Sequence, residues 1–62
     1  MIIKKGKFKA IINFDLEYDE YQVKFYENSK HLINADYFTD DKEEAIDTAN
    51  TELERMDIMD SV

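Results

Sequence analysis

The clearest pattern in the sequence is an alternation of apolar and polar residues between positions 7 and 18. Five of the six odd positions are polar, and every even position is apolar: Phe8, Ala10, Ile12, Phe14, Leu16 and Tyr18. A period of two is typical of a strand that is buried on one side, because successive side chains of a strand point to opposite faces of the sheet. We therefore predict a strand over residues 7–18 whose even positions face inward.

Two further strands are predicted after this one. A turn at Asp19-Glu20 leads into residues 21–26, where apolar side chains again occupy alternate positions: Tyr21, Val23 and Phe25. Asn and Ser within residues 27–30 favour a second turn, and a third strand follows over residues 31–38. Its facing stays open, because one side would carry Ile33, Ala35 and Tyr37 and the other Leu32 and Phe38.

The period changes from strand-like to helical at Thr39. Thr39 or Asp40 is expected to cap a helix, since Asp40 and Glu43 have the spacing of a capping box. The helix then carries a single apolar stripe, made of Ala45, Ile46, Ala49, Leu53 and Met56. We expect it to end between residues 56 and 60 and to cover the sheet with this stripe.

The predicted fold class is therefore α+β. We expect a three-stranded antiparallel β-meander followed by one acidic C-terminal α-helix packed on one face, in the order β-β-β-α. The chain has 62 residues, so it is expected to form a single small domain over residues 1–62. A domain of this size buries little surface by itself, and binding to a partner is one way to increase the buried area.

Charge is distributed unevenly along the chain, whose net charge is −7. Residues 1–39 contain six lysines and six acids, whereas residues 40–62 contain nine acids and two cations, Lys42 and Arg55. The last third of the chain thus carries the whole net charge. Because binding to a phosphate backbone requires clustered cations, we expect no direct binding of nucleic acid.

Several other functions are excluded by what the sequence lacks. There is no cysteine, one histidine and one glycine, so a catalytic cysteine, a thiolate metal site and a glycine-rich phosphate loop are not expected. We predict no catalytic residues, no metal, no cofactor and no enzymatic activity. No apolar run is long enough to cross a bilayer, which predicts a cytoplasmic protein without membrane contact.

The candidate interaction surface is the acidic helix, together with one tyrosine of the sheet. A dense anionic array can attract a protein partner with a basic surface and raise the rate of association. The alternative is that these acids only keep the protein in solution. The candidate partner-binding residues are Asp40, Asp41, Glu43, Glu44, Asp47, Glu54, Asp57 and Tyr26.

Lysines near the N-terminus raise a separate alternative. Tyr26, Lys24 and the lysines of residues 4–9 could form a sheet surface on which single-stranded nucleic acid stacks. We expect instead that the tyrosine covers an exposed sheet face. The lysines are then expected to protect an edge strand from pairing with another chain.

The segment from Phe8 to Leu53 resembles the truncated RNase-H-like domain of HicB antitoxins. The similarity lies in the order of three strands and a helix, and in the helix residues Glu43, Glu44, Ala45, Ala49 and Leu53. Asp41 stands where that family usually has Thr, and Glu20 stands where it usually has Gly. The resemblance implies a protein that neutralises a small ribonuclease by binding it.

In size and composition the chain is also similar to small acidic inhibitors encoded by phages, some of which imitate the charge of nucleic acid. The resulting hypothesis is a non-enzymatic inhibitor or regulator of a basic, nucleic-acid-handling protein, of the antitoxin or anti-defence type. The alternative is a small structural or accessory domain that forms a homodimer. A dimer would use an open sheet edge or the apolar residues Ile58, Met59 and Val62.

Overall fold

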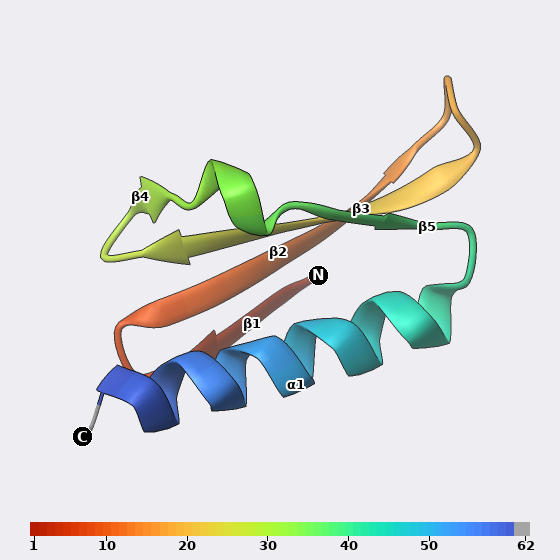
Figure 1. Ribbon diagram of the computed structural model, residues 1–62. Helices are drawn as coiled ribbons and strands as arrows, with labels where there is room; N and C mark the ends of the chain where they lie inside the picture. The colour runs from red at the N-terminus through yellow and green to blue at the C-terminus, as the bar shows by residue number, and fades with distance from the viewer. Residues whose placement is uncertain (61–62) are drawn as a thin grey trace.

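The computed structural model describes residues 1–60 and has two layers, an antiparallel sheet and one helix that covers one of its faces (Figure 1). The predicted α+β class, an antiparallel meander followed by a C-terminal helix, is confirmed. The elements in chain order are β1 (Ile2–Lys5), β2 (Phe8–Asp15), β3 (Glu20–Glu27), β4 (Lys30–His31), the 3₁₀ turn η1 (Ile33–Ala35), β5 (Tyr37–Thr39) and α1 (Lys42–Asp60).

The sheet contains an N-terminal strand, β1, that the alternation did not predict. It pairs with β2 and forms an edge of the sheet, while β3 pairs with β2 on one side and with both β4 and β5 on the other. Gly6 and Lys7 connect β1 to β2. Gly6 has a φ of +59°, which strains a residue with a side chain, and a Cβ at this position would lie 2.6 Å from the Asp57 carboxylate on α1, so the turn favours glycine.

The hydrophobic core lies between the sheet and α1. The inward positions of β2 and β3 meet the small and apolar positions of the helix, as the two periodicities predicted. Tyr21, Ile46 and Met56 pack against this core from its margin. The buried apolar residues are Phe8, Ala10, Ile12, Val23, Phe25, Ala45, Ala49 and Leu53.

The predicted strand over residues 7–18 ends earlier than expected, at Asp15. The Asp15 Oδ1 accepts hydrogen bonds from the backbone N–H groups of Glu17 at 2.9 Å and Tyr18 at 3.4 Å. A side chain that bonds the backbone two and three residues ahead stabilises a turn in place of a sheet ladder. The turn therefore covers residues 16–19, and Glu20 already belongs to β3.

The predicted third strand over residues 31–38 is interrupted. After β4 the chain leaves the sheet, forms the 3₁₀ turn η1 and pairs with the sheet again as β5. The His31 Nε2 lies 2.8 Å from the Asp36 Oδ1, which connects the two ends of this segment. The turn also separates the predicted apolar row. Tyr37 packs against the core, whereas Ile33 is exposed to solvent.

The helix begins later than predicted, because Asp41 is its capping residue. The Asp41 Oδ1 accepts hydrogen bonds from the backbone N–H groups of Glu43 at 2.9 Å and Glu44 at 3.3 Å. Thr39 instead accepts a bond from the N–H of Asp41, and the Asp40 side chain forms no hydrogen bond within residues 1–60. No helix in this part of the chain combines the length and the hydrophobicity needed to cross a bilayer.

We expect the substitution Asp41→Ala to destabilise the domain by about 1 kcal/mol, because it leaves N–H groups of the first helical turn without an acceptor. Asp40→Ala removes the same charge from the neighbouring position, where no cap is formed, and is expected to change stability by less than about 0.5 kcal/mol. Urea denaturation followed by circular dichroism at 222 nm measures both. Equal effects of the two substitutions would contradict the assignment of the cap.

Candidate protein-binding surface

The predicted interaction residues lie in three different places. Asp40, Asp41, Glu43 and Glu44 surround the start of α1 and are exposed. Asp47 and Glu54 are exposed farther along the same helix, and Asp57 is half-buried beside the turn that contains Gly6. The structure thus brings the first four together and spreads the other three helical acids along α1.

Tyr26 does not belong to the same surface as the helical acids. Its cross-strand neighbours are Lys9 and His31, and all three side chains lie on the sheet face opposite α1. The Tyr26 ring stacks on the His31 ring with the centroids 5.0 Å apart, and the Lys9 ammonium lies 5.3 Å from the Tyr26 centroid. A partner bound along α1 would therefore not contact Tyr26.

Some acids of α1 already have partners inside the domain. Glu44 accepts a hydrogen bond from the hydroxyl of Tyr37, which raises the pKa of Tyr37. Glu52 forms an ion pair with Arg55, and this pair raises the pKa of the Arg55 guanidinium. In contrast, the Glu43, Asp47 and Glu54 carboxylates form no ion pair or hydrogen bond within residues 1–60.

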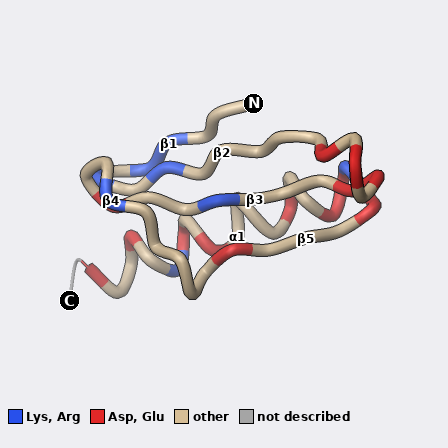
Figure 2. The backbone as a smooth tube through the Cα atoms, turned by 90° about the horizontal axis from the view of Figure 1, so that it is seen from above, with Lys and Arg blue, Asp and Glu red and all other residues tan. Residues whose placement is uncertain are grey.

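A second group of acids, which was not among the predicted partner-binding residues, lies toward the same end of the molecule as the start of α1. Tyr21 pairs with Thr39, so Glu20 on β3 reaches the level of Asp40. Figure 2 shows the acids of the β2–β3 turn and of the helix start toward the same end of the molecule and the lysines of β1 and β2 toward the other, while Figure 1 shows that the β2–β3 turn rises away from the helix start. We call this group the acidic end; its members are Asp15, Glu17, Asp19, Glu20, Asp40, Asp41, Glu43 and Glu44.

The acidic end also carries large apolar side chains that are exposed to solvent. Leu16 is 87% exposed and Tyr18 is 70% exposed, and both lie in the turn, so the prediction that they face inward was wrong. Phe14 lies on the inward face of β2 opposite Tyr21, as predicted, but it is 42% exposed. The β2–β3 hairpin projects away from α1 (Figure 1), and Phe14 contacts the Tyr21 ring edge-on with the centroids 4.8 Å apart. We call Phe14, Leu16 and Tyr18 the apolar tip.

Sequence reasoning missed the apolar tip because alternation does not show where a strand ends. The signal that could have found it is Asp15 itself, since an aspartate whose side chain bonds the following backbone favours a turn. Residues 16–18 then belong to a loop at the end of a hairpin. In a loop, the alternation of apolar and polar residues does not determine which side chains are buried.

The arrangement at this end matches the chemistry of a protein interface. Binding energy in such interfaces is concentrated in a few aromatic and apolar side chains, which are surrounded by polar residues that exclude water and set specificity. Here the apolar tip alternates along the hairpin with four acids, Asp15, Glu17, Asp19 and Glu20, and four more acids lie at the helix start beyond β5. Within residues 1–60, no three residues of the His, Cys, Asp or Glu types are grouped closely enough to hold a metal ion.

Comparison with protein-family models, with curated proteins and with solved structures finds no match for this chain. The resemblance to HicB antitoxins therefore stays a hypothesis. The fold and the charges of the chain itself are the basis for the function proposed below.

Proposed function

We propose that this protein is a non-enzymatic inhibitor or regulator that binds the basic surface of a nucleic-acid-handling protein through its acidic end. The observation that supports the proposal is the exposure of Leu16 and Tyr18 on a projecting hairpin (Figure 1) whose own sequence alternates them with the acids Asp15, Glu17 and Asp19. The acids attract a cationic partner over a long range, and the apolar tip then supplies contacts that exclude water. The interaction takes place in the cytoplasm.

The kind of partner follows from the sign and density of the charge. Protein surfaces that bind nucleic acid are rich in lysine and arginine, and they present these cations to a dense row of phosphates. An acidic end of eight carboxylates competes for the same cations. Blocking a toxin ribonuclease, as the HicB resemblance implies, and blocking a host enzyme, as phage inhibitors do, are two instances of this mechanism.

Two variants separate the electrostatic and the apolar contributions once a partner has been captured and purified. Glu17→Gln/Asp19→Asn removes two charges of the acidic end, and Asn tolerates the left-handed φ of 54° at position 19. We expect it to slow association about tenfold at low salt, because steering acts on the on-rate. Leu16→Ser/Tyr18→Ser removes the apolar contacts and is expected to speed dissociation about tenfold.

Stopped-flow or surface plasmon resonance kinetics at two salt concentrations measures these rates. The control is Glu54→Lys, which also changes the net charge by two units but lies on the C-terminal half of α1. We expect it to leave dissociation unchanged and to slow association less than twofold. If Glu54→Lys weakens binding as much as the first two variants, or if neither of them changes it, the proposal for the acidic end is wrong.

Homodimerisation is the second candidate, and the observation that favours it is the open edge of β1. Met1 and Ile2 are exposed there, and an edge strand offers unpaired backbone groups to a second chain. Ile58 and Met59 are also exposed on α1, while Val62 lies outside the described residues. Sedimentation velocity over a hundredfold dilution separates the candidates, since a persistent dimer supports this one and a monomer the inhibitor.

A further inference from the structure

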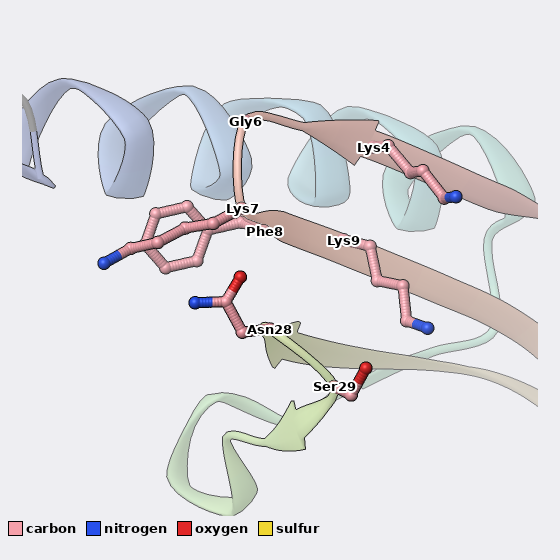
Figure 3. A pocket seen from close by; sticks show the side chains of 7 residues that line it. All are labelled: Lys4, Gly6, Lys7, Phe8, Lys9, Asn28 and Ser29. Atoms are coloured by element: carbon pink, nitrogen blue, oxygen red, sulfur yellow. The ribbon is translucent and has the colours of Figure 1, made fainter.

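A small hollow lies at the end of the sheet opposite the acidic end. Two tight turns enclose it, the β1–β2 turn at Gly6 and the β3–β4 turn at Asn28 and Ser29, and the N–H of Asn28 donates a hydrogen bond to the carbonyl of Lys7 between them. Its volume is about 220 Å³. The residues that line it are Lys4, Gly6, Lys7, Phe8, Lys9, Asn28 and Ser29 (Figure 3).

Two lysines of the hollow face each other across the sheet. Lys4 on β1 pairs directly with Lys9 on β2, so their side chains leave the same face of the sheet, and in Figure 3 they extend in the same direction. Like charges at directly opposite positions of neighbouring strands destabilise a sheet. The chain has fifteen carboxylates, yet within residues 1–60 neither Lys4 nor Lys9 forms an ion pair.

Lys7, in the same turn, differs from Lys4 and Lys9 because it forms two ion pairs. Its Nζ lies 2.7 Å from Asp60 and 3.3 Å from Glu27, and the hydrogen bonds to these two carboxylates raise the pKa of Lys7. In Figure 3 the Lys7 side chain extends away from Lys4 and Lys9. The positive charge that remains available in the hollow is therefore that of Lys4 and Lys9.

Protection of the sheet edge does not account for both lysines. Lys4 lies on the edge strand β1, where a charge discourages pairing with another chain. Lys9 lies on β2, which is paired on both sides, so its charge protects no edge. The side chain of Ser29, which lies on the side of Lys9 in Figure 3, also forms no hydrogen bond within residues 1–60, whereas the Asn28 side chain extends toward Lys7.

We propose that this hollow binds a phosphate group, held by the ammonium groups of Lys4 and Lys9 and by the hydroxyl of Ser29, which lies on the same side of the hollow as Lys9 in Figure 3. A phosphate offers several acceptor oxygens and up to two negative charges, which would relieve the repulsion between the two lysines. About 220 Å³ corresponds to roughly seven waters at ~30 Å³ each, which is sufficient for a phosphate and part of the group that carries it.

This inference does not depend on the proposed function, because the hollow and the acidic end lie at opposite ends of the molecule. It also differs from binding of a long nucleic acid. A long polyanion would extend toward the acidic end and be repelled there, whereas a single phosphate group interacts with the lysine end alone. The phosphate could belong to a small molecule or to the end of a strand, and the experiment distinguishes these two sources.

The experiment is an NMR titration of the ¹⁵N-labelled full chain at low salt with three probes: inorganic phosphate, uridine monophosphate and a 5′-phosphorylated pentauridylate. We expect saturable shifts of the amides of residues 4–9 and 28–29. Lys4→Gln/Lys9→Gln is expected to weaken binding about tenfold or more, because it removes two charged donors. Lys42→Gln/Arg55→Gln, which changes the net charge equally, is expected to weaken it less than twofold.

The outcomes decide both the site and the source of the phosphate. Equal affinity for the monophosphate and the pentamer supports a small-molecule ligand, whereas tighter binding of the pentamer supports the end of a strand. Thermal unfolding shows whether Lys4→Gln/Lys9→Gln still folds, and its loss of repulsion predicts an unchanged or higher Tm. The proposal is overturned if none of the probes gives saturable shifts, if acetate shifts the same amides equally, or if the two double variants weaken binding to the same extent.

Discussion

Replacing Phe25 by alanine is expected to destabilise the domain by about 3–5 kcal/mol, which is enough to unfold much of the population. Phe25 is 1% exposed and lies on β3, the strand that pairs with β2, β4 and β5. Its removal leaves a cavity that the neighbouring strands and α1 cannot fill by collapsing. A 62-residue domain has a total stability of roughly 3–9 kcal/mol, so this single loss is comparable to the whole.

Phe38→Ala is the matched control for this prediction. Phe38 is also a sheet phenylalanine, but it is 51% exposed and pairs with Gln22 on the face opposite α1. We expect its replacement to cost less than about 1 kcal/mol. Urea titrations that follow circular dichroism at 222 nm measure both, and comparable shifts of the two midpoints would show that the core does not lie between the sheet and α1.

The sequence was sufficient to predict the core because periodicity encodes which face of an element is buried. Val23 and Phe25 alternate with polar neighbours, and Ala49 and Leu53 recur at helical spacing, so each pair identifies an inward face by its spacing alone. These two periods fix the two layers and their order along the chain.

The ends of the elements could not be predicted in the same way, because individual hydrogen bonds set them. Asp15 ends β2 by bonding the backbone ahead of it, and Asp41 begins α1 by accepting N–H groups from the first turn. β1 shows no alternation, since Ile2 and Ile3 are followed by Lys4 and Lys5. Its pairing depends on the turn at Gly6.

The apolar tip and the Lys4–Lys9 pair could not be predicted from periodicity either, because both depend on where a strand ends or how two strands are aligned. The exposure of Leu16 follows from where β2 ends, and the meeting of Lys4 with Lys9 follows from the register across the Gly6 turn. A two-residue turn at Gly6-Lys7 would have placed Lys5 opposite Phe8, and therefore Lys4 opposite Lys9. A hairpin turn assigned to Gly6 would therefore have predicted that Lys4 and Lys9 are paired.

The uneven charge along the sequence becomes a separation in space. The acidic end lies at the hairpin tip and the helix start, and Lys4 and Lys9 lie at the opposite end of a molecule whose longest dimension is 39 Å. This length is several times the Debye length of about 8 Å at physiological ionic strength. The acidic end therefore presents negative charge, whereas the opposite end combines Lys4 and Lys9 with Lys7 and its partners Glu27 and Asp60, and the net charge of −7 describes neither of them.

The substitution Ala49→Asp is expected to detach α1 from the sheet and to cost several kcal/mol, because it places a carboxylate where no water reaches. Ala49 is 0% exposed and lies in the middle of the stripe that contacts the core. An unpaired charge at such a position loses its hydration and gains no partner. We expect most of the helical signal at 222 nm to be lost at pH 7 and 25 °C, while Asn50→Asp, on the exposed neighbouring position, changes stability by less than about 1 kcal/mol.

The pH dependence of Ala49→Asp tests the cause of this loss. Burial disfavours the charged form, so the introduced carboxyl has a higher pKa in the folded state than in the unfolded state, where it is close to 3.9. The destabilisation relative to the parent chain is therefore largest above the folded-state pKa and shrinks as the pH falls toward 3.9, because the neutral acid is tolerated better. A difference in unfolding free energy that stays constant between pH 7 and pH 4 would indicate that side-chain size, and not charge, disrupts the contact between α1 and the sheet.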